Sequence, residues 1–518
     1  MTKILAAIVA LSFFACGGKA RIAAAPPDPA LEARLREASS LYTRGAYVTL
    51  KKAFSIYEEL YTRPAFRERT ALAFLRTCLL LSLREREIGI VNFAFSDKAA
   101  RLLAENPLLT AYAPYLKIIT SLAPKSKGAM KDVDLSFIRS QDTEEMDRIR
   151  RVLKAGASRD EFLACLYTSI YAYNFDPYSG EKEDISVYVK LFPDSLFLRF
   201  KNMTWPEIVP EGLESILREE PEFYEVYYYL GDFALQEGGL LKAEEDFLKA
   251  AGGIPESSLP LILLAGIYFA VEETEKSLEF YERTLALSPE YREAMLGKAI
   301  CLSSLGRPAE AVPILERLIE LGYILMGESH YWLARNLHEL GRDREALESI
   351  DQSKGRLPMN SEVFGLAGTL ASGMGEFVRA EKDFRESLQY NARNSEALFG
   401  LGTICAIKKR WSESGQYYEN ASAAFEAGEW ALRDKVHEIE QSSLSPERKE
   451  RLLRKKNAQI QAVLLSMASA FYGAALSWLE AGDGARAKEL ALKAAEHPSY
   501  KAKSEEIIKK SAVGSRSG

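Results

Sequence analysis

The chain repeats a pattern of residues every 34 positions through its middle and later part. The first copy begins near Tyr224 and carries the pair Leu230-Gly231, followed by Ala243, Phe247 and Pro255. The corresponding pairs of the next copies are Leu264-Ala265, Lys298-Ala299, Leu333-Ala334, Ala367-Gly368 and Leu401-Gly402, with one extra residue before the third of these. Six consecutive copies in one register predict a stack of similar units, each in contact with its neighbours, in place of a fold around one central core.

Each copy is predicted to form two helices joined by a tight turn. Apolar residues follow helical spacing, as in Tyr227, Leu230 and Ala234 of the first copy. The second helix carries a small residue that can face the small residue of the first: Ala243, Ser277, Ala311, Ala346, Ala380 and Ser414. First helices are expected to end with positive φ at Gly238, Gly306, Gly341 and Gly375, and second helices to end before Pro255, Pro289 and Pro358.

This pattern resembles the tetratricopeptide repeat, a helix–turn–helix unit, over residues 224–428. The resemblance implies an all-α fold, a solenoid of helical hairpins that winds as a right-handed superhelix. Weaker helical-hairpin copies are predicted at 31–107 and, as a C-terminal tetratricopeptide-like repeat, at 468–498. The period is lost in 108–223, which is expected to be an irregular helical region. Long helices are expected in 429–467 and a basic tail in 499–518.

The first thirty residues are predicted to direct export. Residues 1–15 form a signal peptide, in which a short apolar run after Lys3 is too short to span a bilayer. The run ends in Ala15-Cys16 and resembles a bacterial lipobox, which implies lipidation of Cys16, with residues 16–30 as a flexible tether. The alternatives are ordinary cleavage after Ala25 and a retained hydrophobic anchor. Gly17 stands where an Asp would signal inner-membrane retention, so the resemblance favours the outer membrane, with the chain facing the periplasm.

Charge and hydropathy limit the other partners. No later segment approaches 18 apolar residues, so membrane attachment is expected through the lipid anchor alone. The net charge of -6 disfavours nucleic acid, although residues 446–518 carry 14 Lys and Arg against 8 Asp and Glu. Their densest cluster runs from Arg448 to Lys456 and is expected to be a solvated helix face. The alternatives for this cluster are anionic lipid head groups, an acidic partner, or the acidic body of this same chain.

The sequence carries little that could support catalysis. His330 and His338 are eight positions apart, whereas a zinc helix uses a spacing of four, and the loop 176–184 lacks the alternating oxygens of a calcium loop. The remaining cysteines lie in apolar helical segments and are expected to be buried free thiols: Cys78, Cys165, Cys301 and Cys405. We therefore predict no catalytic residue, no cofactor and no metal, and a chain that is not an enzyme.

The resemblance also places a binding groove. In the tetratricopeptide register the second, fifth, ninth and twelfth positions of each copy line the concave face. The groove-lining residues predicted in this way are Tyr228, Leu235, Ile262, Phe269, Leu296, Ile300, Tyr331 and Arg335. The Lys and Asn of a carboxylate clamp are missing from the matching positions, so capture of chaperone C-termini is not implied. The strip is either open to a partner or covered by the chain's own segment 421–468, whose Ile460, Val463, Leu464 and Met467 follow helical spacing.

These observations predict a lipid-anchored periplasmic scaffold that binds another protein of the cell envelope. The alternative is an accessory subunit of a solute transporter, in which the groove holds a small hydrophobic ligand. A catalytic site hidden in residues 108–223 is the third and most distant possibility.

Overall fold

The computed structural model describes residues 28–122, 143–173, 184–204, 207–322 and 325–514. Every regular element among these residues is a helix, and none of them is a strand. The chain divides into two compact units, and for the described residues the boundary falls between Pro255 and Glu256. The first repeat belongs to the first unit and repeats two to six belong to the second, so the two units are described separately.

The first unit surrounds a core of large apolar side chains, among them Phe74, Leu79 and Leu81 on one long helix. Its helices are α2 (Pro29–Arg44), α3 (Tyr47–Tyr61), α4 (Pro64–Glu87), α5 (Ala94–Glu105), the short 3-10 helix η1 (Pro107–Tyr112), α6 (Ala113–Ser121), α9 (Thr143–Ala157), α10 (Glu161–Tyr173), α11 (Ser186–Leu191), α12 (Leu196–Thr204), α13 (Pro210–Glu219), α14 (Glu225–Gln236) and α15 (Leu240–Gly253). The last two form repeat one.

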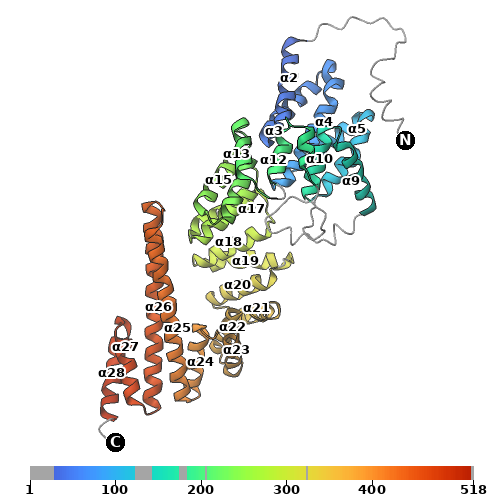
Figure 1. Cartoon of the computed structure of the whole chain (residues 1–518). Coiled ribbons are helices and arrows are strands. Elements are labelled where there is room, and N and C mark those ends of the chain that lie inside the picture. The colour runs from blue at the N-terminus through green and yellow to red at the C-terminus, as the bar shows by residue number, and fades with distance from the viewer. Residues whose placement is uncertain (1–27, 123–142, 174–183, 205–206, 323–324, 515–518) are drawn as a thin grey trace, which may run out of the picture. The chain divides into compact units, whose positions relative to one another are not determined.

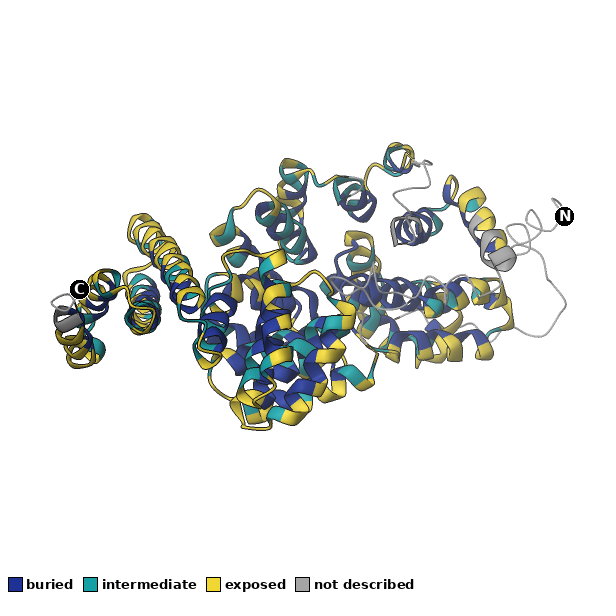
Figure 2. Ribbon diagram, turned by 90° about the horizontal axis from the view of Figure 1, so that it is seen from below, coloured by how far each residue is buried: buried dark blue, intermediate teal, exposed yellow. Residues whose placement is uncertain are grey.

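The second unit stacks helical hairpins one after another (Figure 1). Repeat two is α16 (Leu259–Ala270) and α17 (Thr274–Leu287), repeat three is α18 (Arg292–Ser304) and α19 (Pro308–Glu320), and repeat four is α20 (Met326–Glu339) and α21 (Asp343–Arg356). Repeat five is α22 (Ser361–Gly373) and α23 (Phe377–Tyr390), and repeat six is α24 (Ser395–Ile407) with the start of α25 (Trp411–Gln441). After these come α26 (Pro446–Glu480), α27 (Gly484–Ala495) and α28 (Pro498–Gly514). In Figure 2 the buried residues face neighbouring helices and the exposed residues cover the outside.

Two C-terminal segments differ from their expected boundaries. The second helix of repeat six does not end near residue 428. Glu426 stands where Pro255 ends the first copy, and α25 continues through Gly428 to Gln441. The segment predicted as a basic tail is helical as far as Gly514. It forms α28 because Ile507 and Ile508 pack on the apolar faces of α26 and α27.

The small residues of each repeat allow its two helices to approach closely. A Cβ built on Gly231 would lie 2.8 Å from a ring carbon of Phe247, and one on Gly368 would lie 2.5 Å from the ring of Phe384. The expected partner of Gly231, Ala243, is fully buried, but the side chain that meets the glycine is Phe247, one helical turn further on. Each glycine is therefore the socket for the aromatic ring of the facing helix.

Serine replaces alanine at two of the facing small positions, and the replacement has a local reason. The Ser277 hydroxyl donates to the carbonyl oxygen of Ala265 at 2.8 Å, and Ser414 donates to that of Gly402 at 2.8 Å. In both repeats the acceptor is the small residue of the first helix, so the hydroxyl is satisfied inside the crossing and burial without water is tolerated.

The turns inside the repeats adopt the expected left-handed conformation. Gly238, Gly306, Gly341 and Gly375 have φ between 69° and 79°. Repeats two and six carry Glu272 and Lys409 at this position instead, with φ of 59° and 58°. Positive φ costs free energy for residues with a side chain. The strain at these two positions must therefore be offset by contacts elsewhere in the fold.

A buried ionic network links the N-terminal helices of the first unit to repeat one. Arg84, which is 1% exposed, contacts Glu87 and Glu225 at 2.6 Å each, and Lys201 contacts Glu87 at 2.5 Å. Glu225 also accepts from the backbone N–H of Tyr47 at 2.8 Å. Because each of these buried charges has an opposite partner, the network holds helices together, and residues 108–223 contribute to it through Lys201.

We expect Gly231→Leu to destabilise the first unit by about 1–3 kcal/mol, because the new side chain displaces the ring of Phe247. Urea unfolding followed by circular dichroism measures the change. Gly252→Leu in the same repeat is the matched control, since a Cβ there meets nothing within 4 Å. Equal stability of the two variants would show that the register assigned to the repeats is wrong.

Candidate functional site

The predicted groove residues lie on first helices, but they differ in how accessible they are. In the second unit α16, α18 and α20 are neighbours, so Ile262, Phe269, Leu296, Ile300, Tyr331 and Arg335 occupy one face. Ile262 and Leu296 are only 8% and 7% exposed, and they pack between helices. Phe269 is 41% exposed and Arg335 is exposed, whereas Ile300 and Tyr331 are half-buried. The accessible part of this strip is therefore narrower than its sequence pattern implies.

Tyr228 and Leu235 lie on α14 in the first unit, and both are half-buried. The Tyr228 ring contacts Tyr229 and Phe247, so part of its surface serves packing inside repeat one. These two residues therefore belong to the first unit, and the six on α16, α18 and α20 belong to the second.

A long hairpin, α25 with α26, follows the last repeat (Figure 1). Near its base the Ser414 and Ser477 hydroxyls are 2.8 Å apart, and the Trp478 indole N–H donates to Glu419 at 2.6 Å. Near its tip, the first turns of α26 contact the turn between α16 and α17 of repeat two. From Lys456 to Ser477 helix α26 extends roughly 30 Å. It therefore connects the second repeat to the sixth.

The contact at the hairpin tip is ionic, and we refer to it as the tip latch. Arg448 and Arg451 of α26 pair with Glu273, the latter at 3.1 Å, and Lys456 pairs with Glu272. Lys455 donates to the carbonyl oxygen of Glu272 at 2.9 Å. The tip latch thus joins the predicted basic cluster to the acidic body of the same chain, one of the alternatives for that cluster.

Burial makes the tip latch more than a surface contact. Glu273, Lys456 and Arg448 are 3%, 5% and 9% exposed, and the Arg448 guanidinium lies 5.8 Å from the centroid of the Tyr268 ring. Burial raises the pKa of the Glu272 carboxyl, but the hydrogen bond from Lys456 and the charges of Lys456 and Lys455 outweigh it, so that the pKa is lowered. The same contacts hold the positive φ of Glu272 in place.

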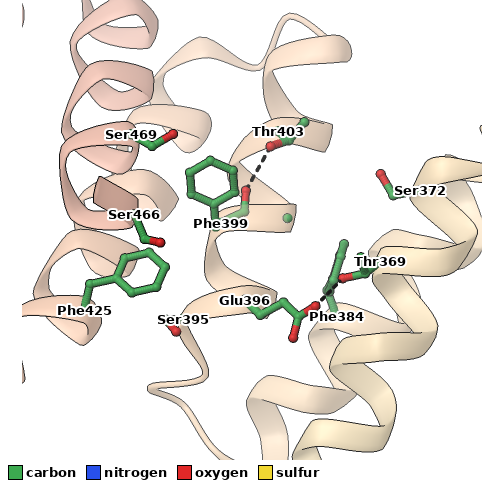
Figure 3. A pocket seen from close by; sticks show the side chains of 11 residues that line it. Thr369, Ser372, Phe384, Ser395, Glu396, Phe399, Thr403, Phe425, Ser466 and Ser469 are labelled. Carbon is green, nitrogen blue, oxygen red and sulfur yellow. Dashed lines mark hydrogen bonds between the residues drawn. The ribbon is translucent and has the colours of Figure 1, made fainter. Parts of the chain in front are cut away.

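A pocket of about 370 Å³ opens between repeats five and six and the hairpin (Figure 3). Helix α22 supplies Thr369 and Ser372, and α24 supplies Glu396, Phe399 and Thr403. The hairpin closes the pocket with Phe425 of α25 and with Ser466 and Ser469 of α26. Glu396 accepts a hydrogen bond from the Thr369 hydroxyl at 2.8 Å, and the Thr403 hydroxyl lies 2.9 Å from that of Tyr418.

The pocket residues of α22 and α24 occupy groove positions of the register, although they are absent from the residues predicted above. Thr369 and Ser372 are the ninth and twelfth positions of repeat five, and Glu396, Phe399 and Thr403 are the second, fifth and ninth of repeat six. Extending the register through the last two copies would have found them. The hairpin residues could not be found in this way, because Phe425 is not at a groove position of repeat six, and Ser466 and Ser469 lie beyond the last repeat.

Helix α26 is long and apolar enough to cross a membrane, and it is the one helix of which this holds among the described residues. The expectation that no later segment would reach this composition is therefore wrong. The cause is a stretch without any charged residue between Lys456 and Glu480, in which Gln and Ser interrupt the apolar residues. Core helices of water-soluble proteins pass the same test. Both ends of α26 are bound to other helices of the second unit by the contacts described above.

The remaining candidates for chemistry have structural roles in the described part of the chain. The four cysteines outside the signal region are free and buried, as predicted: Cys78, Cys165, Cys301 and Cys405. His330 lies 3.3 Å from the Ser349 hydroxyl, and His338 lies 2.6 Å from Asp343. No group of three or more His, Cys, Asp or Glu side chains that could hold a metal ion occurs among the described residues. Cys16 and most of the loop 176–184 lie outside those residues.

Two family models described as tetratricopeptide repeat match the sequence, one over residues 268–322 and one over residues 366–429. Both matches fall inside the hairpin stack of the second unit. The chain contains tetratricopeptide repeats. Its fold is an all-α tetratricopeptide-repeat solenoid, and repeats of this kind are protein-binding scaffolds.

Parts of the sequence are similar to curated proteins. It is 25% identical over 183 residues to the human protein O-mannosyl-transferase TMTC1, and 28% identical over 152 residues to anaphase-promoting complex subunit 7 of Dictyostelium discoideum. The matches cover 34% and 29% of this chain but 20% and 26% of those proteins, so this chain spans only a fraction of their length.

Several solved structures resemble it at low overall similarity. YrrB, described as having an unusual peptide-binding site, is 22% identical and covers 35% of this chain and 93% of its own, with a TM-score of 0.31. A tetratricopeptide-repeat protein from Parabacteroides merdae is 18% identical and covers 52% and 95%, with a TM-score of 0.34. PilF of Pseudomonas aeruginosa is 19% identical and covers 38% and 88%, with a TM-score of 0.34.

We expect Arg448→Ala to weaken the tip latch of this tetratricopeptide chain, lowering local stability by about 1–3 kcal/mol, because Glu273 loses its most buried partner. Amide hydrogen exchange of the α16–α17 turn measures the effect locally. Arg454→Ala is the control on the same helix, since Arg454 is 79% exposed and its loss costs less than about 0.5 kcal/mol. Equal protection of the turn in both variants would mean that the tip latch contributes nothing.

Proposed function

We propose that this chain is a lipid-anchored scaffold of the bacterial cell envelope, which binds another protein through the concave face of its repeats and catalyses no reaction. The observation that carries the proposal is the open part of that face in the second unit. Phe269 exposes 41% of its surface there, and the pocket of about 370 Å³ lies among the groove positions of repeats five and six. Exposed aromatic surface and a pocket on one face are typical of a protein-binding site.

The lipobox-like sequence at Ala15-Cys16 supports the proposed address at the periplasmic side of a membrane, with the outer membrane favoured by Gly17. The partner proposed on this basis is a protein of the envelope, and the membrane is contacted through the lipid anchor.

A second candidate function follows from the same pocket. An accessory subunit of a solute transporter would hold a small hydrophobic ligand, and the rings of Phe399 and Phe425 offer it an apolar surface. Mass spectrometry of small molecules that co-purify with the mature chain separates this candidate from the scaffold.

Replacing Cys16 by Ala tests the address. We expect the variant to leave the membrane fraction for the soluble fraction, because stable anchoring requires two or more acyl chains and the variant can carry none. Fractionation after a high-salt wash, with the unchanged chain in parallel, measures the result. A variant that stays with the membranes would place the anchor elsewhere.

Two substitutions on the concave face test the groove. Phe269→Asp changes an exposed side chain, so we expect loss of crosslinking to the envelope partner with an unchanged melting temperature. Leu296→Asp is the contrasting variant, because Leu296 is 7% exposed and a buried carboxylate destabilises the repeat by about 2 kcal/mol or more. If Phe269→Asp leaves every crosslink in place, this face does not bind the partner.

A further inference from the structure

We propose that the pocket between α22, α24 and the α25–α26 hairpin binds an extended peptide segment through a lysine or arginine side chain. The Glu396 carboxylate would receive the positive charge, and the rings of Phe399 and Phe425 would flank the side-chain stem. The inference rests on the proposed protein-binding function and specifies the chemistry of the segment that is bound.

The repeats carry carboxylates at one recurring register position. The second position of a repeat is Glu in five of the six copies: Glu225, Glu293, Glu328, Glu362 and Glu396. In repeat one this carboxylate already binds a base of its own chain, since Glu225 holds the Arg84 guanidinium at 2.6 Å with both side chains 1% exposed. A second-position Glu of this chain can thus act as a receptor for a guanidinium.

The tip latch gives a second internal precedent. There the Arg448 guanidinium lies over the Tyr268 ring while it pairs with Glu273, so that one basic side chain meets a carboxylate and an aromatic ring together. The pocket offers the same pair of groups, Glu396 and the ring of Phe399, on one helix. Cations bind favourably over aromatic rings, and the methylene stem of a long basic side chain packs on apolar surface.

In repeats five and six the matching carboxylates have no such partner. Glu362 and Glu396 are exposed, and no basic side chain lies within 4.0 Å of either among the described residues. Burial, followed by the charge of Glu362 and more weakly that of Glu396, raises the pKa of Tyr331, whereas Arg335 acts in the opposite direction. Both carboxylates therefore act on the same stretch of the groove, and the guanidinium of Arg335 is 3.9 Å from Glu339.

The rest of the pocket fits a peptide better than a lipid. Figure 3 shows hydroxyl groups around the space between the phenyl rings, contributed by three different helices. Ser372, Ser395 and Ser469 are half-buried, and their hydroxyls can donate to or accept from a peptide backbone. A volume of about 370 Å³ takes one long side chain with its flanking backbone.

The chain's own C-terminal basic cluster is not the occupant. The basic cluster at the start of α26, the helix that closes the pocket, is engaged in the tip latch at repeat two. An acidic segment would be repelled by Glu362 and Glu396. The occupant is therefore a basic segment of another protein.

A panel of synthetic peptides tests the inference with the full-length mature chain. A short Gly/Ser/Ala host peptide carries one central residue, which is Lys, Arg, Leu or Glu, and fluorescence polarisation reports binding at low ionic strength. We expect the Lys and Arg peptides to bind at least about fivefold more tightly than the Leu and Glu peptides, and to lose this preference as salt is added. Equal binding of all four, or no binding by any, would overturn the proposal.

Substitutions then place the binding in the pocket. Glu396→Gln keeps the acceptor for Thr369 and removes the charge, so we expect it to weaken the Lys and Arg peptides about fivefold and the Leu peptide little. Glu348→Gln on the second helix of repeat four is the matched control, because Glu348 is exposed there. An equal effect of the two variants would contradict the assignment to Glu396.

A filled pocket separates this inference from the proposed function. Ser469→Trp, with its fold verified by circular dichroism, should block the basic peptides and also the crosslinks to the envelope partner. If both variants at the pocket still capture the partner, while Phe269→Asp does not, the scaffold stands and the basic-segment site is wrong. If the chain without substitutions captures no partner but binds basic peptides as described, the site stands and the envelope partner is wrong.

Discussion

The close approach of two helices at a small residue determines most of this fold. Where Gly231 or Gly368 faces an aromatic ring of the second helix, each hairpin closes tightly but leaves one flank uncovered. Another hairpin of the same shape covers that flank, so the repeats stack in sequence order. Stacking aligns the first helices on one face, and it brings the second, fifth, ninth and twelfth positions of neighbouring repeats together. The binding face is thus a consequence of packing at residues that never touch a ligand.

The hairpin of α25 and α26 adds a contact that stacking does not require. Its base is fixed by hydrogen bonds of hydroxyl and indole groups. Its tip is fixed by ion pairs between residues that are about 180 positions apart in the chain. Only 28% of the most apolar stretch of α26 is buried, and between its ends the helix packs along α25. A helix held in this way forms a defined wall beside repeats five and six, where the pocket lies.

The predictable part of the structure is the part that repeats. Residue identities at fixed spacing revealed the hairpins and the glycine turns, because each depends on contacts within a repeat or to the next one. The buried thiols were predicted from their apolar neighbours in sequence. The tip latch was only one alternative among several, since Arg448 and Glu273 are far apart in sequence and obey no period. The sequence pattern also could not predict which residues of the groove strip are buried. Ile262 and Phe269 are the fifth and twelfth positions of repeat two and both belong to the groove pattern, yet Ile262 is 8% exposed and Phe269 is 41% exposed.

Charge separation along the chain links the hairpin to the groove. The C-terminal region carries an excess of bases in an otherwise acidic chain, and the structure places four of them against two carboxylates of repeat two. Those carboxylates are neutralised, whereas Glu362 and Glu396 are left without a basic partner at hydrogen-bond distance among the described residues. The tip latch therefore does two things at once. It positions α26 as a wall of the pocket. It also keeps the chain's own basic cluster away from Glu362 and Glu396, so that these two carboxylates remain available to a basic group from another molecule.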